Sequence, residues 1–229
     1  MRYWLIIFVA VCLFIGYPVV TDSGSPKKTI ALTFDDGPRP YVLEGLLPLL
    51  ERYNIKTTFF VCGEKVLENK DLVKAMHESG HEIENHSWGH PNCVKLLAKN
   101  NGHELLRQNL EKTSNVIFQA TGRRPRFFRP PYWEINKEVE QIAFEVGCES
   151  LKIGNPDVNT MDYDDFAQRR SSEVLIKRVK SLVAAREQRG IFNHVLTFHE
   201  LPVTVEALRE LIPYFQNCGY KFIRVDETK

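Results

Sequence analysis

The sequence has no excess of either charge, because its 229 residues carry 30 Lys and Arg against 29 Asp and Glu. A broad basic surface is therefore not expected, and we predict no nucleic-acid partner. Internal repeats and low-complexity segments are also missing. With 43% hydrophobic and 26% charged residues, the composition excludes collagen-like, coiled-coil and wholly disordered chains and fits a single globular domain. Composition makes no prediction of oligomeric state.

Cysteine is scarce, and none of it has the spacing of a zinc or redox motif. Beyond Cys12 there are four, with no CxxC among them: Cys62, Cys93, Cys148 and Cys218. This excludes a dense disulfide framework. An exported protein could pair two of them, but we interpret them as small, largely buried hydrophobes.

Charge is absent from residues 3–20, a stretch of bilayer-spanning length that follows Arg2. We predict that residues 1–20 are a targeting segment and favour an uncleaved membrane anchor, since IGYPVV at 15–20 lacks a small-residue cleavage pattern. A cleaved signal peptide and a buried core helix are the alternatives. An anchor would hold the domain outside the membrane, whereas cleavage would make it secreted or periplasmic. Residues 21–28 (TDSGSPKK) read as a linker and residues 29–229 as the domain.

Short apolar runs alternate with longer amphipathic ones from residue 29 onward, which predicts an α/β fold with a parallel sheet and a barrel-like closure. The stretch at about 154–171 is expected to be irregular. Expected strands lie at 29–34, 57–61, 82–84, 126–129, 149–153, 194–198 and 221–225, and expected helices at 41–53, 67–79, 104–121, 136–147, 172–189 and 203–218.

Two polar clusters directly follow expected strands, where α/β folds place their active sites. In TFDDGP, the adjacent carboxylates of Asp35 and Asp36 would not both ionise comfortably without a cation or a shared proton. In HSWGH, His86 and His90 have the i, i+4 spacing that lets two imidazoles on a helical turn reach one metal. It is not the HExxH motif, because Ser87 stands where the Glu would be. A surface turn and an unliganded histidine pair are the structural alternatives.

Two further clusters complete the set. In RPPY, the double proline would fix the amide of Tyr132 as an oxyanion donor and Arg129 could orient a carboxylate, although a merely rigid loop is the alternative. In LTFHE, a buried strand delivers His199 to its C-terminal end, where a structural histidine is the alternative.

Together these four motifs, in this order, resemble the NodB-homology family of metal-dependent polysaccharide deacetylases over essentially the whole of residues 29–229. The resemblance implies a distorted (β/α)7 barrel and a divalent metal, most often Zn²⁺, with Co²⁺ or a similar ion as the alternative. It implies the following roles: Asp36, His86 and His90 as metal ligands, Asp35 as general base, Arg129 as its tether, Tyr132 as oxyanion donor, His199 as general acid, and Leu196 as lining for the acetyl methyl.

One family motif departs from its pattern. Where relatives have Asp-x-x-Asp-Trp, this chain reads Asn159-Thr160-Met161-Asp162-Tyr163. We align Asn159 with the Asp that partners the histidine acid, so that it would hydrogen-bond His199 without supplying charge. Asp157 is the alternative partner if the loop is shifted, and Tyr163 keeps an aromatic wall at the acetyl pocket.

The resemblance implies hydrolysis of N-acetyl groups on polysaccharides containing N-acetylglucosamine. Peptidoglycan is favoured over chitin-type oligomers, because an anchor would hold the enzyme beside the cell wall. The alternatives are a deacylase of another acylated glycan such as xylan, of a lipid-linked sugar or of a small amide. A non-catalytic carbohydrate-binding pseudoenzyme, motivated by Asn159, is the alternative from another class.

Overall fold

The computed structural model describes residues 27–150 and 158–228. In these ranges the strands are β1 (Thr29–Gly37), β2 (Thr58–Val61), β3 (Glu82–Asn85), β4 (Phe127–Phe128), β5 (Glu149–Ser150), β6 (Val158–Asn159), β7 (Asn193–His199) and β8 (Lys221–Ile223). The helices are α1 (Pro40–Arg52), α2 (Gly63–Glu68), α3 (Lys70–Glu78), α4 (Cys93–Leu97), α5 (Gly102–Thr121), α6 (Lys137–Glu145), α7 (Asp162–Ala167), α8 (Ser172–Glu187) and α9 (Pro202–Asn217), with 3₁₀ turns η1 (Pro131–Trp133) and η2 (Val225–Glu227).

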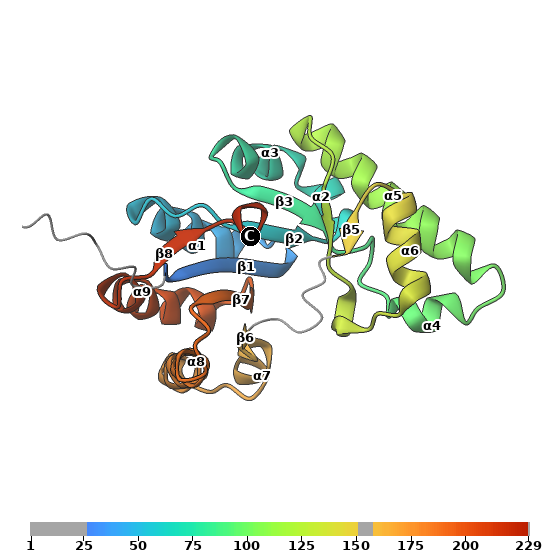
Figure 1. Ribbon diagram of the computed structural model, residues 1–229. Helices are drawn as coiled ribbons and strands as arrows, with labels where there is room; N and C mark the ends of the chain where they lie inside the picture. The colour runs from blue at the N-terminus through green and yellow to red at the C-terminus, as the bar shows by residue number, and fades with distance from the viewer. Residues whose placement is uncertain (1–26, 151–157, 229) are drawn as a thin grey trace, which may run out of the picture.

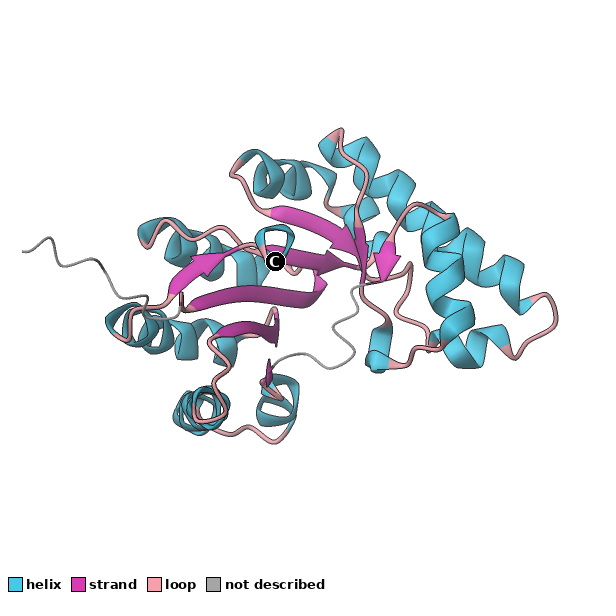
Figure 2. Cartoon of the chain, viewed as in Figure 1, coloured by secondary structure: helices cyan, strands magenta, loops and turns pink. Residues whose placement is uncertain are grey.

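Every strand pair is parallel, in the order β5-β4-β3-β2-β1-β7-β6, and β8 pairs with the first residues of β1. Figure 1 shows this sheet curling, and Figure 2 shows helices surrounding it. The predicted parallel α/β architecture is confirmed. Since the strands are parallel, their carboxyl ends share one rim, and the loops that leave that rim meet.

The two faces of the sheet have different chemistry. On β1, Ile30, Leu32 and Phe34 belong to the main core that packs against helices such as α1 and α9. The alternate residues Thr33 and Asp35 are also buried but face the interior of the curl. Because successive side chains of a strand point to opposite faces, β1 places apolar side chains on the outer face of the sheet and polar ones on the inner face.

The long helix α5 illustrates how the outer layer is covered. Its buried residues recur at three- and four-residue intervals, which gives one apolar stripe: Leu106, Leu110, Thr113, Ile117 and Ala120. The helix ends at Gly122, whose positive φ of 73° gives the left-handed cap that glycine adopts without strain.

The predicted element order is confirmed, with local differences. The helix expected at 67–79 corresponds to α3 and the last two residues of α2, which begins earlier, at Gly63, and ends before Asn69. The short helices α4 and α7 were not predicted, because five or six residues are too few to display a helical period. Only Glu149 and Ser150 of the strand expected at 149–153 fall within the described residues.

The four cysteines of the described ranges are free, and Cys62, Cys93 and Cys148 are buried as expected. Cys218 is exposed, so the prediction of burial is wrong there: it follows the last residue of α9, where the helix ends at the surface. No helix within 27–150 and 158–228 has both the length and the hydropathy to cross a membrane. The predicted anchor at 1–20 and most of the linker at 21–28 lie outside the described residues.

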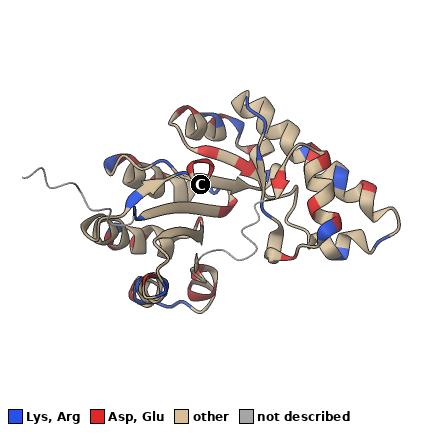
Figure 3. Ribbon diagram, viewed as in Figure 1, with Lys and Arg blue, Asp and Glu red and all other residues tan. Residues whose placement is uncertain are grey.

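Charges are mixed along the helices rather than sorted by sign, as Figure 3 shows. This agrees with the near balance of acidic and basic residues in the sequence. The interior is different, because β3 carries the two buried carboxyl groups of Glu82 and Glu84.

Candidate metal and acid–base site

The predicted site residues converge at the carboxyl ends of four strands. Asp36 lies at the end of β1, His86 directly after β3, Arg129 directly after β4, and His199 at the end of β7. In the sheet, Asp35 of β1 is the register partner of His199 on β7. The parallel order of strands therefore gathers residues that are far apart in the sequence.

An irregularity in β1 brings two adjacent carboxylates to the same side. The register of β1 against β2 shifts between Phe34 and Gly37, and Asp36 has a left-handed φ of 67°. In a regular strand, Asp35 and Asp36 would point to opposite faces. A bulge of this kind re-aims a side chain, and here it lets Asp36 approach the histidines while Asp35 stays inside.

His86 and His90 both approach the carboxylate of Asp36. Their Nε2 atoms lie 3.3 and 3.1 Å from Asp36 Oδ1. The helical turn expected from their spacing is absent: residues 86–90 form a loop in which Ser87 and His90 have positive φ. Left-handed residues, rather than helical periodicity, make the two rings converge.

The geometry of this cluster fits a bound divalent cation. The ligand atoms of Asp36, His86 and His90 all lie within 4.8 Å of one another, and buried Asp36 Oδ1 accepts no hydrogen bond. His86 Nδ1 lies 2.7 Å from the carbonyl of Arg129, which only accepts, so this nitrogen carries the proton and Nε2 is free to ligate. Burial raises the pKa of Asp36, but the contacts with His86 and His90 outweigh it, and the pKa lies well below its usual range. One carboxylate with two imidazoles suits Zn²⁺.

Asp35 is held by Arg129 in the buried interior. Arg129 Nη1 donates to Asp35 Oδ1 at 2.6 Å and to Thr33 Oγ1 at 2.8 Å. The guanidinium lies over the Phe60 ring at 4.0 Å. This buried ion pair and its hydrogen bonds fix the orientation of the Asp35 carboxylate, which is the contact predicted for Arg129.

Tyr132 lies beside the metal cluster. It follows Pro130 and Pro131, has a φ of 58°, and its exposed ring contacts His90 edge-on with centroids 4.7 Å apart. The two prolines fix the backbone that carries its amide. The structure thus brings Tyr132 to the site, and its role as an oxyanion donor stays a prediction.

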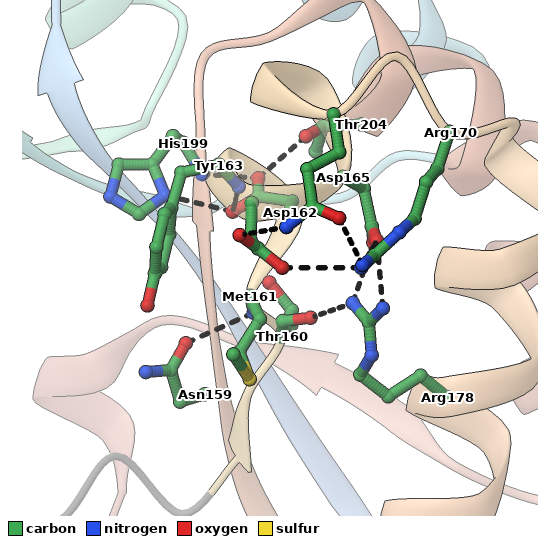
Figure 4. Close-up of polar contacts among 12 residues, drawn as sticks. Asn159, Thr160, Met161, Asp162, Tyr163, Asp165, Arg170, Arg178, His199 and Thr204 are labelled. Atoms are coloured by element: carbon green, nitrogen blue, oxygen red, sulfur yellow. Dashed lines mark hydrogen bonds and ion pairs between the residues drawn. The ribbon is translucent and has the colours of Figure 1, made fainter.

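His199 forms the opposite side of the site together with a residue that the sequence analysis did not select. Its Nδ1 lies 2.8 Å from Oδ1 of Asp162, a fully buried carboxylate on α7 (Figure 4). Burial lowers the pKa of His199, but Asp162 and, more weakly, Asp35 and Asp36 raise it to about 9. The raised pKa favours the protonated imidazole, the form that a general acid requires.

The predicted pairing of Asn159 with His199 is wrong. Asn159 Oδ1 instead accepts a hydrogen bond from the amide of Met161 at 3.0 Å. The charged partner is Asp162, the Asp of the Asn-x-x-Asp-Tyr motif. The alternative partner, Asp157, lies outside the described residues. The Asp-Tyr pair at the start of an acidic helical turn was the signal that could have identified it. Tyr163 does lie at the site, with its ring edge-on to His199.

The predicted pocket role of Leu196 is also wrong. Leu196 is fully buried in the main core on the helix-covered face of the sheet. Leu196 lies three positions before His199 on β7, and this odd spacing directs the two side chains to opposite faces of the sheet. Thr197, two positions before His199 on β7, shares the inner face with it.

One rim of the curled parallel sheet thus gathers a carboxylate with two imidazoles, a buried carboxylate held by an arginine, and a histidine paired with an aspartate. The sequence matches the family model described as polysaccharide deacetylase over residues 22–151. The chain belongs to the polysaccharide deacetylase family, in agreement with the resemblance of its motifs.

The similarity extends beyond the family model. The chain is 37% identical over 202 residues to the peptidoglycan-N-acetylglucosamine deacetylase PgdA of Listeria monocytogenes, covering 88% of this chain and 39% of that protein. It is 30% identical to a peptidoglycan-N-acetylglucosamine deacetylase of Bacillus cereus, covering 93% and 92% of the two chains. The chain thus spans well under half of the Listeria relative's length.

A solved structure of a CE4 family pseudoenzyme from Bacillus anthracis superposes with a TM-score of 0.75 at 28% identity, covering 88% of this chain and 65% of that one. This likeness confirms the expected barrel fold of the family.

Proposed function

We propose that this protein is a metal-dependent deacetylase that removes N-acetyl groups from N-acetylglucosamine units, with peptidoglycan as its substrate and Zn²⁺ at Asp36, His86 and His90. The observation that carries the proposal is the placement of Asp35 and His199 on neighbouring strands beside the metal cluster. One is a buried, tethered carboxylate and the other a protonated imidazole. The peptidoglycan deacetylases among its relatives support the substrate class.

The chain's own residues divide the reaction between them. Asp35, oriented by Arg129, takes a proton from the attacking water, and the amide of Tyr132 donates to the carbonyl oxygen as negative charge develops. His199 then gives its proton to the departing nitrogen, so that the sugar amine and acetate are released. When bound, a divalent cation at the cluster would polarise the carbonyl and lower the pKa of water.

The pseudoenzyme alternative has less support. Its motive was the loss of a charged partner for His199, but Asp162 supplies that charge. Base, acid and three ligands are all present and converge.

The site of action is a further part of the proposal. We propose that residues 1–20 anchor the protein in the cell membrane with the domain outside, next to the cell wall. Chitin-type oligomers fit the same chemistry and are the second candidate substrate.

Mass spectrometry after incubation of the purified full-length protein with peptidoglycan or chito-oligomers tests the function. The expected result is a loss of about 42 Da per acetyl group, as acyl transfer to water replaces acetyl by hydrogen. Asp35→Asn is the control that should remove it. Acetylated xylan is incubated in the same way as a third substrate. Loss of acetyl groups from xylan alone would reassign the substrate, and no loss of acetyl groups from any of the three polymers would contradict the deacetylase proposal.

A further inference from the structure

The partner of His199 is held by contacts that extend away from the reacting groups. The Asp162 carboxylate accepts hydrogen bonds from the backbone and Nδ1 of His199, from Thr204 Oγ1 and from the Tyr163 amide (Figure 4). Since the imidazole is held through Nδ1, the position of Asp162 sets where Nε2 points. Whatever fixes Asp162 therefore fixes the acid.

The chain turns sharply just before Asp162. Met161 has a φ of 56°, a left-handed value that is uncommon for a residue other than glycine. On one side of the turn, Asn159 Oδ1 accepts from the Met161 amide. On the same side, the Thr160 hydroxyl donates to the carbonyl of Thr197 at 2.6 Å. A strained conformation persists only when surrounding contacts hold it.

Arg178, on α8, joins both ends of this turn. Its Nη1 donates to the Thr160 carbonyl at 2.9 Å and to Asp165 Oδ2 at 2.5 Å, while Nη2 donates to Asp165 Oδ1 at 2.7 Å. Asp165 is fully buried and lies on α7 with Asp162. One guanidinium thus binds the chain before Asp162 and the helix after it, as Figure 4 shows.

We propose that Arg178 is a positioning residue for the general acid, which it aligns by fixing Asp162 through Thr160 and Asp165. The inference rests on the proposed function, in which His199 protonates the departing amine. Arginine suits this role because its planar fork reaches a carboxylate and a carbonyl together, which a lysine ammonium does not. The charged groups around His199 are Asp162 from α7 and Asp35 and Asp36 from β1.

The leaving group provides the test. An amide needs its nitrogen protonated, whereas 4-nitrophenyl acetate releases a stable anion and does not depend on the acid. In Arg178→Gln, kcat for a chito-oligomer should fall about 10–100-fold, less than the roughly 10²–10⁴-fold that complete loss of a general acid costs, while ester hydrolysis and metal content stay nearly unchanged. Equal loss on both substrates would overturn the proposal.

Arg170→Gln is the matched control. Arg170 contacts the same Asp165 carboxylate, at 3.2 Å, and also Asp164, but it has no contact with the Thr160 carbonyl. The Arg170 variant should keep both activities. The proposal is wrong if the Arg170 and Arg178 variants lose amide hydrolysis to the same extent.

Removing Arg178 alone leaves the buried Asp165 carboxylate with only the 3.2 Å contact to Arg170, a loss of charge compensation that destabilises the fold. The double variant Arg178→Met, Asp165→Leu removes the pair without that charge and should show the same selective loss of amide hydrolysis. Arg178→Lys should fall between wild type and Arg178→Gln. Full amide turnover in a folded double variant would overturn the proposal.

NMR of the full-length protein with ¹⁵N-labelled histidine reports the acid without any activity. The hydrogen-bonded Nδ1–H of His199 should give a resolved signal in wild type and in Arg170→Gln, and this signal should broaden or shift in Arg178→Gln. An unchanged signal in Arg178→Gln would contradict the inference. If wild type hydrolyses neither substrate, the proposed function fails, and the NMR comparison still decides the role of Arg178.

Discussion

At the scale of single residues, the pH dependence of turnover depends on the charge of Asp162. The pKa of His199 lies at about 9 although burial lowers it, because Asp162 and, more weakly, Asp35 and Asp36 favour the charged imidazole. A general acid works only while protonated, so activity is lost as pH rises through that pKa. In Asp162→Asn the alkaline limb of the kcat–pH profile should move to lower pH, and kcat should fall at neutral pH.

Asn159→Asp is the comparison for this measurement. Its side chain contacts the Met161 amide and not His199, so the limb should stay in place. If the alkaline limb of the kcat–pH profile shifts in Asn159→Asp but stays in place in Asp162→Asn, the hydrogen bond from His199 to Asp162 does not set the pKa of the acid.

Adjacent aspartates should have separable roles. Asp36→Asn weakens a ligand and should reduce metal content, whereas Asp35→Asn removes the base and should lower kcat by about 10²–10⁴ with the metal retained. Elemental analysis beside steady-state kinetics makes the comparison. Equal loss of metal in the two variants would mean that both carboxylates hold the ion.

The sequence was sufficient to select the carboxylates and histidines that converge at the site, because their motifs are local. Asp35 with Asp36, and His86 with His90, lie within a few residues of each other, so the short spacing carries the information. Asp162 was missed because its proximity to His199 depends on the path of the chain across some forty residues and on the left-handed turn at Met161. Leu196 was misassigned because it is close to His199 in the sequence, whereas the alternation of side chains along β7 places the two on opposite faces of the sheet.

At the scale of elements, β3 should make stability depend on pH. Burial, opposed by a hydrogen bond from Phe127 and reinforced by neighbouring Glu82, raises the pKa of Glu84 above its usual 4.5. The folded protein then keeps a proton that the unfolded chain releases, so stability falls as pH rises above about 4.5 and towards the raised pKa.

Glu84→Gln removes this titration while its side-chain oxygen can still accept from Phe127. Thermal unfolding between pH 5 and 9 should therefore show a flatter Tm profile for this variant than for wild type. Parallel profiles would show that Glu84 ionises freely in the fold. Glu68→Gln is the control for the loss of one charge, because Glu68 is an exposed residue on the short helix α2. Its Tm profile should run parallel to that of wild type.

The long elements were predictable and the short ones were not. Helix α5 has twenty residues with a clear apolar stripe, while α4 and α7 have five and six. Helix α7 exists because tertiary contacts, such as that between Arg178 and Asp165, hold it, and such contacts leave no periodic pattern. The part of the site that depends on α7 was therefore hidden from the sequence.

At the scale of the whole molecule, metal removal should lower thermal stability. The three ligands come from the ends of β1 and β3, so a bound ion joins segments some fifty residues apart. An ion present at 100 times its Kd stabilises the folded state by about 2.7 kcal/mol. For a domain of this size that corresponds to a Tm shift of roughly 5–10 °C.

Calorimetry with and without a chelator measures this shift, and added Zn²⁺ should reverse it. His86→Ala should show no response to the chelator. A wild-type Tm that ignores the chelator would show that the folded protein holds no ion under those conditions.

The central position of β1 has a consequence for biosynthesis. Residues Thr29 to Asp35 pair along their whole length with β7, which begins at Asn193. At about 5–20 residues per second, the ribosome makes β7 on the order of 8–30 s after β1. During that time one flank of the innermost strand offers bare N–H and C=O groups, a template for pairing with another nascent chain. Translation therefore leaves β1 as an open edge until the last part of the chain emerges, and a polypeptide that stops short of β7 would carry Asp36, His86 and His90 on a sheet whose edge strand is β1.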